Sequence, residues 1–362
     1  MVSSDVRRRF GGRAAHVVLI VAATLATLAV PTTDSLARQR KPPVEAPPPP
    51  PPPPAGPVGL PDRMLQDAAA YDGYVRAASA TSPAFTDAAA VASALKQTGA
   101  YSPKTLVRGA VAYGAIAALE DAAFVASVRE AGNTPEHRRE MVGYIIANPA
   151  YVALFKDADA AAGLVREAIG PASLQLYATG RAVKQSAYDI QKQAWSKAQV
   201  ADLQGRLSSA EAQAQEDMAP DPARLMAERQ SVAGVAPIAL PNAPLPTISG
   251  NTPLVSHALQ LAAIAALGEA TDTAYDQLVG LEVDSDTQAC LATAKRNFHQ
   301  CLAVAKPNYE DIFCMGQHGL RDTGACMARA AGFETPPEPL PPPPAPKPAR
   351  STAKVIHRHK RG

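Results

Sequence analysis

The stretch 290–326, CLATAKRNFHQCLAVAKPNYEDIFCMGQHGLRDTGAC, decides the fold because it holds every cysteine of the chain. Lys306-Pro307-Asn308 divides it into two segments of helical composition and predicts an antiparallel helical hairpin. Disulfide partners across one hairpin must share a sequence midpoint at the turn. This condition predicts two nested bonds, Cys290–Cys326 and Cys301–Cys314.

The two other pairings do not fit a single hairpin. In the crossed pairing the two midpoints fall on either side of the turn, and neighbouring cysteines on one helix would lie ~16 Å apart. A zinc site built from Cys301, Cys314, His299 and His318 is the competing interpretation, but these residues lack the ligand spacing of zinc motifs. We therefore expect disulfides and no cofactor.

The helical positions of the cysteines fit the nested bonds in the first arm of the hairpin but not in the second. Cys301 follows Cys290 by eleven residues, which returns an α-helix to within about 20° of the same face. Cys326 follows Cys314 by twelve, which leaves about 120°. We expect a helix break near Gly316, Gly319 or Gly324 to correct this phase.

The remaining sequence is alanine-rich, poor in aromatic residues and typical of closely packed helices. Side-chain caps followed by proline mark helix starts at Ser82-Pro83, Ser102-Pro103, Thr134-Pro135, Asn148-Pro149 and Thr252-Pro253. The sequence predicts an all-α protein, with helices near 63–80, 83–97, 103–131, 135–147, 149–169, 172–217, 253–280, 286–305 and 308–331.

Proline-rich stretches divide the chain into six parts. We expect a signal peptide or uncleaved anchor at 1–37, a disordered spacer at 38–61 and a helical domain at 62–217. A linker at 218–250, a cysteine-containing helical domain at 251–333 and a disordered basic tail at 334–362 follow.

The predicted long helix 172–217 carries a weak heptad pattern. Leu176, Val183 and Ile190 recur every seven residues, as do Gly180 and Ala187 four positions later. This pattern fits a coiled coil with a protein partner or, more commonly, packing on the bundle of the chain itself.

The N-terminal segment indicates export. Basic residues at Arg7, Arg8 and Arg9 precede the apolar run 14–30, and Ser35-Leu36-Ala37 supplies small residues for cleavage. The run also has nearly the length of an uncleaved anchor, and its arginines partly match a twin-arginine signal. Either outcome places the folded part outside the cytoplasm, in the periplasm or at the cell surface.

The C-terminal tail is basic. It could contact an anionic envelope surface such as lipid head groups or acidic glycans, or it could serve only for solubility. It has no interleaved aromatic residues, so we expect no nucleic-acid partner. The candidate contacts are Lys347, Arg350, Lys354, Arg358, Lys360 and Arg361.

The sequence contains none of the common hydrolase, zinc-protease, phosphate-binding or dinucleotide motifs. We therefore expect a non-catalytic structural or binding component of the bacterial envelope. Two alternatives remain: a subunit of a secretion or assembly apparatus that uses 172–217 as its partner surface, and a glycan-active enzyme with two carboxylates in a cleft.

Overall fold

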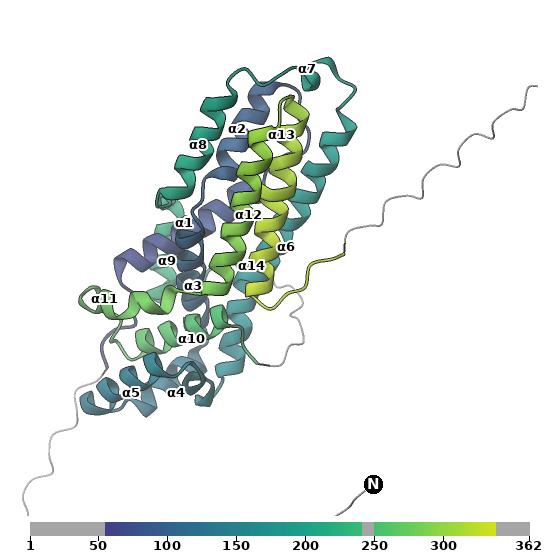
Figure 1. Ribbon diagram of the computed structural model, residues 1–362. Helices are drawn as coiled ribbons and strands as arrows, with labels where there is room; N and C mark the ends of the chain where they lie inside the picture. The colour runs from purple at the N-terminus through teal and green to yellow at the C-terminus, as the bar shows by residue number, and fades with distance from the viewer. Residues whose placement is uncertain (1–54, 241–249, 338–362) are drawn as a thin grey trace, which may run out of the picture. The chain divides into compact units, whose positions relative to one another are not determined.

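The computed structural model describes residues 55–240 and 250–337, and the regular elements in these ranges are helices (Figure 1). The predictions for residues 1–54, 241–249 and 338–362 lie outside the described residues. The all-α prediction is confirmed. The helices are α1 (Asp62–Ser79), α2 (Ala88–Gly99), α3 (Pro103–Leu119), α4 (Ala122–Ala131), α5 (Pro135–Ala147), η1 (Pro149–Leu154), α6 (Ala158–Asp189), α7 (Ala194–Lys197), α8 (Leu203–Gln215), α9 (Pro222–Val232), α10 (Pro253–Ala266), η2 (Asp272–Ala274), α11 (Tyr275–Leu278), η3 (Val279–Glu282), α12 (Ser285–Val304), α13 (Asn308–Cys314), the π-helix η4 (Met315–Asp322) and α14 (Thr323–Ala330).

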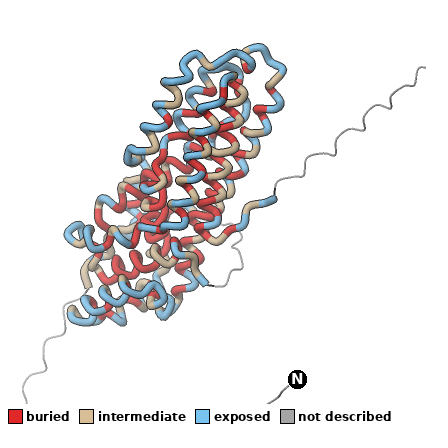
Figure 2. The backbone as a smooth tube through the Cα atoms, viewed as in Figure 1, coloured by how far each residue is buried: buried red, intermediate tan, exposed pale blue. Residues whose placement is uncertain are grey.

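The core lies around α3, which α1, α6 and α10 contact (Figure 2). Small side chains allow these helices to approach closely: a methyl group on Gly109 of α3 would overlap the backbone of Asp67 on α1. Helices from the two predicted domains also pack together, since α10 contacts α3 and α14 contacts α6. The C-terminal hairpin is therefore attached directly to the alanine-rich helices.

The disulfide-linked hairpin is present as predicted. Helix α12 ends at Val304, and α13 begins at Asn308 after a short turn. The Cys290–Cys326 and Cys301–Cys314 bonds join its two arms, with Cα–Cα distances of 5.8 and 5.6 Å. These distances are normal for disulfides, so both bonds fit the antiparallel packing of the arms.

The expected helix break in the second arm is instead a change of helix type. Residues Met315–Asp322 form a π-helix that continues from α13 into α14. A π-helix has more residues per turn than an α-helix. Over the twelve positions from Cys314 to Cys326 it therefore rotates the chain about one residue less than an α-helix would. The helical rotation from Cys314 to Cys326 is then close to the rotation from Cys290 to Cys301. Both cysteines of the second arm therefore point toward α12.

Helix α6 runs along the second arm of the hairpin with little space between the two backbones. A methyl group on Gly180 of α6 would overlap the backbone of Arg321, and one on Gly316 of the π-helix would overlap the backbone of Lys184. The first part of the predicted heptad pattern, Leu176 and Val183, is buried within the described chain. This packing on the bundle is the commoner of the two outcomes that we expected.

Capping residues explain most helix starts. Ser102, Thr134, Asn148 and Thr252 accept backbone hydrogen bonds at the predicted positions. The start at Ser82-Pro83 is wrong, because Asp87 caps α2 five residues later. Likewise, the predicted helix starting at residue 286 begins one residue earlier and is capped by Asp284.

Several predicted helix boundaries are wrong. Helix α6 continues through Pro171, where a break between 149–169 and 172–217 was predicted, and the predicted helix 253–280 ends at Ala266. Three aspartates account for other differences. Asp121 caps α4, so the predicted helix 103–131 is two helices, bent by 90°. Asp202 caps α8, and the predicted helix 172–217 is broken after Asp189. Asp221 caps α9 inside the predicted linker 218–250. At Asp121 a short side-chain cap outweighs the apolar periodicity that runs past it.

Among the described residues, no single helix combines the length and apolar character of a membrane span; α3 and α4 meet that criterion only as a bent pair.

We predict that Gly180→Ala lowers the free energy of unfolding by about 1–3 kcal/mol, because the added methyl group overpacks the contact with the π-helix. Gly143→Ala is the matched control: Gly143 lies in α5 with open space around it, and the same change should stabilise the protein by about 0.5–1 kcal/mol. Urea denaturation measures both. Equal effects of the two substitutions would contradict the close packing of α6 on the hairpin.

Candidate functional site

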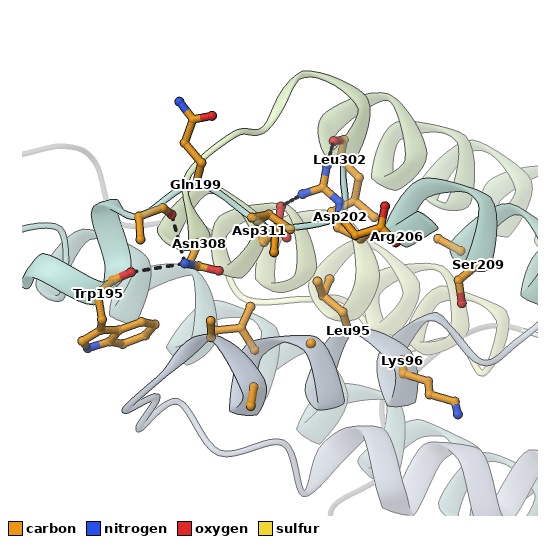
Figure 3. A pocket seen from close by; sticks show the side chains of 18 of the residues that line it. Leu95, Lys96, Trp195, Gln199, Asp202, Arg206, Ser209, Leu302, Asn308 and Asp311 are labelled. Atoms are coloured by element: carbon orange, nitrogen blue, oxygen red, sulfur yellow. Dashed lines mark hydrogen bonds and ion pairs between the residues drawn. The ribbon is translucent and has the colours of Figure 1, made fainter. Parts of the chain in front are cut away.

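A pocket of about 610 Å³ lies between α2, α8, α12 and α13, beside the turn of the hairpin (Figure 3). It extends from Trp195 and Asn308 at one end to Ser209 and Lys96 at the other. Its α2 wall alone runs from Ala88 to Lys96, which is roughly 12 Å of helix. This volume is in the range of small-molecule binding sites.

Most of the lining is apolar. Val91 and Leu95 of α2, with Phe298 and Leu302 of α12, form a buried floor. The mouth is lined by small side chains that are exposed to solvent: Ala88, Ala89 and Ala92 of α2, with Ala198 and Ala201 opposite. The pocket is therefore a hydrocarbon surface that water reaches from one side.

The segment between α6 and α8 forms one end of the pocket and is held on the hairpin turn. The Val200 nitrogen donates to the Lys306 carbonyl at 2.9 Å, and the Asn308 nitrogen donates to Ala198 at 3.1 Å. The Asn308 side-chain amide donates to the carbonyls of Trp195 at 3.2 Å and Ala198 at 3.0 Å. The hairpin thus determines where Trp195 lies.

Arg206 attaches α8 to both arms of the hairpin. Its guanidinium pairs with the Asp311 carboxylate of α13 and donates to the carbonyls of Leu302 and Ala305 at the end of α12. Those carbonyls have no partner within their own helix. Arg206 satisfies them and fixes the position of α8 at the pocket wall.

The Asp311 carboxyl is almost fully buried beside this arginine. Burial raises the pKa of Asp311 to about 6, and the hydrogen bond from Arg206 opposes that increase. The native state therefore holds a proton more readily than the unfolded chain between pH about 4 and 6, so this group contributes less stability as the pH rises through that window.

A buried lysine lies behind the floor of the pocket. Lys295 of α12 donates to the Gly99 carbonyl at the end of α2, and its ammonium lies 4.4 Å from the centre of the Tyr101 ring. Burial lowers the pKa of Lys295 to about 7. The carbonyl and the aromatic ring stabilise its charged form, and the contact joins α2 to the hairpin.

A second group of titratable side chains lies between α1, α3 and η3. Arg108 pairs with Asp67, and its Nε lies 3.7 Å from the Glu282 carboxylate. Burial raises the pKa of Glu282 to about 8, so Glu282 is mostly protonated at neutral pH. The two carboxylates line neither the large pocket nor the smaller ones beside Glu269 and Asp284. This group joins α1, α3 and η3.

The structure brings together the predicted cysteines and leaves the other candidates untested. Both bonds are formed, so the sulfurs of Cys301 and Cys314 are not thiolate ligands. Within residues 55–240 and 250–337, no three His, Cys, Asp or Glu side chains are arranged to hold a metal ion. The basic tail residues 347–361 lie outside the described residues.

The sequence analysis missed the residues that build the pocket, Trp195, Arg206, Asn308 and Asp311. Asp202, the cap of α8, was a usable signal, because it marks a helix start just before Arg206. No local pattern relates Arg206 to Asp311, which lies 105 residues further along the chain.

Comparisons with protein-family models, curated proteins and solved structures found no match for this chain. The site is therefore interpreted from its own geometry.

We predict that Arg206→Met lowers the free energy of unfolding by about 3–5 kcal/mol, because it leaves the Asp311 carboxylate buried without its partner. The loss should be larger at pH 8 than at pH 5, since below its raised pKa Asp311 is mostly neutral. Arg139→Met is the control: its pair with Glu136 is exposed, and the change should cost less than about 1 kcal/mol. Denaturation curves at both pH values measure the effect, and equal losses for the two variants would show that the buried pair has no special role.

Proposed function

We propose that this chain is exported from the bacterial cytoplasm and serves in the periplasm or at the cell surface as a non-catalytic binding component. The pocket between α2, α8, α12 and α13 is its ligand site in this proposal. The observation that carries the proposal is an apolar pocket whose wall includes a disulfide-linked hairpin.

The inner disulfide lies beside the pocket. Cys301 is adjacent to Leu302 of the floor, and Cys314 is one helical turn from Asp311. Disulfides form and persist mainly in oxidising compartments. A site beside such a bond is suited to the envelope, and in this proposal the basic and apolar N-terminal segments supply the export signal.

The proline-rich arms fit the same role. In this proposal the proline-rich residues that precede the described part of the chain separate the helical part from a membrane. In this proposal the basic tail contacts an anionic surface through Lys347, Arg350, Lys354, Arg358, Lys360 and Arg361.

We expect the protein in its native host to fractionate with the envelope and to contain no free thiol. Differential alkylation before and after reduction, followed by mass spectrometry, measures the thiols, while immunoblots of cell fractions give the compartment. A cytosolic protein with four free cysteines would overturn the proposal.

The two disulfides should affect stability and binding differently. Removing the outer bond with Cys290→Ala/Cys326→Ala should cost about 1 kcal/mol more stability than removing the inner bond, because it closes a loop of 36 residues against 13. Cys301→Ala/Cys314→Ala should weaken binding of an apolar fluorescent dye more, because only the inner bond lies beside the pocket. Thermal denaturation measures the stability of the two double variants, and dye titration measures their binding. If the outer bond controls dye binding, the ligand site lies elsewhere.

A further inference from the structure

We infer that the pocket binds a single linear acyl chain, with the polar head of the ligand left in water beside Lys96 and Ser209. This inference rests on the proposed function, since it names the ligand of the same site. Three observations support it: several polar side chains of the lining are already bonded within the chain, the walls carry small apolar side chains, and the floor is apolar while one end is polar.

Four hydrogen-bonding side chains of the lining, Asn308, Gln213, Trp195 and Arg206, are already bonded within the chain, whereas Lys96, Gln199 and Ser209 are exposed to water. Asn308 donates to two backbone carbonyls, and Gln213 donates to the Lys96 carbonyl at 3.4 Å. The Trp195 ring nitrogen donates to Gln193 at 2.6 Å. Arg206 is bound to Asp311 and to carbonyls of the hairpin. A ligand that depends on hydrogen bonds would have to break these contacts, whereas a hydrocarbon chain needs none.

The walls suit a narrow ligand. Ala88, Ala89 and Ala92 line the pocket from the first two turns of α2, and Ala198 and Ala201 line it from the segment before α8. These methyl groups are solvent-exposed in the described chain, so covering them with hydrocarbon would remove apolar surface from water.

The floor and one end of the pocket differ in polarity. Leu95, Phe298 and Leu302 of the floor are buried and apolar, while Lys96 and Ser209 at one end are polar and exposed. A chain seated on the floor would leave its head group beside the exposed polar side chains. An amphiphile with one acyl chain has this distribution of polarity.

The proline-rich segments of this chain are the competing occupants. Pockets that bind polyproline present aromatic side chains together with donors for the peptide carbonyls. Here the ring nitrogen of Trp195 is bonded to Gln193, and the other aromatic side chain of the lining, Phe298, is buried in the floor. The observations therefore favour the acyl chain, and peptide binding is an outcome of the test.

The test uses Trp195, the sole tryptophan of the chain, as a fluorescence reporter in the full-length oxidised protein. Octanoate, decanoate, dodecanoate and tetradecanoate are titrated below their micelle-forming concentrations. Affinity should rise about fourfold per methylene until the chain fills the pocket. A monoacyl phospholipid with the dodecanoyl chain shows whether the head group of a membrane lipid is also accepted.

Ala92→Asp supplies the blocking variant, because it places a charge in the apolar mouth and should weaken dodecanoate binding at least about tenfold. Ser93→Asp is the matched control. Ser93 is the next residue of α2, is exposed and does not line the pocket. The affinity of the Ser93→Asp variant for dodecanoate should therefore match that of the unsubstituted protein. Circular dichroism melts of both variants establish that they are folded.

Affinity that does not depend on chain length, or that falls equally in the two variants, would overturn the acyl-chain inference. Tight binding of a peptide with residues 43–57 but not of dodecanoate would assign the pocket to the proline-rich arm. If an apolar dye binds the protein but not the Ala92→Asp variant, while fatty acids do not bind, the acyl-chain inference is wrong and the pocket is still a ligand site. If neither dye nor fatty acid binds, the pocket as ligand site in the proposed function fails as well.

Discussion

The structure depends on one geometric constraint: in each arm of the hairpin, both cysteines must point toward the other arm. The first arm meets it with an α-helix, because Cys301 follows Cys290 by eleven positions. The second arm has twelve and meets it through the π-helix Met315–Asp322. An ordinary α-helix there would turn Cys326 away from Cys290. The two covalent bonds therefore select an otherwise uncommon helix type.

The π-helix also determines how α6 packs. Wider helical turns displace the backbone, and α6 accommodates this with glycine at the contact: Gly180 lies against Arg321, and Gly316 lies against Lys184. Since α6 also contacts α3, α1 and α10, the hairpin is fixed relative to the alanine-rich core. The pocket then forms where α2 and α8 lie beside the turn of that hairpin (Figure 1).

The sequence predicted what depends on local geometry. Cysteine pairing followed from one turn and two helix lengths, and four cap-proline pairs marked true starts because the cap acts within one helical turn. The breaks at Asp121 and Asp202 were missed, since alanine-rich sequence continues in helical register across both. The pocket could not be predicted, because it depends on the contact of Arg206 with Asp311, which only the folded chain brings together.

That contact explains why charged groups lie in an apolar wall. A residue such as methionine could fill the volume of Arg206, but it would leave the last carbonyls of α12 and the buried Asp311 carboxyl without partners. Apolar packing alone would also tolerate a shift of α8 along the hairpin, whereas several directed hydrogen bonds from one guanidinium hold it in one position. A fixed α8 keeps its distance from α2. The buried ion pair therefore maintains the pocket as an open space, although the ligand that we infer makes no use of its charges.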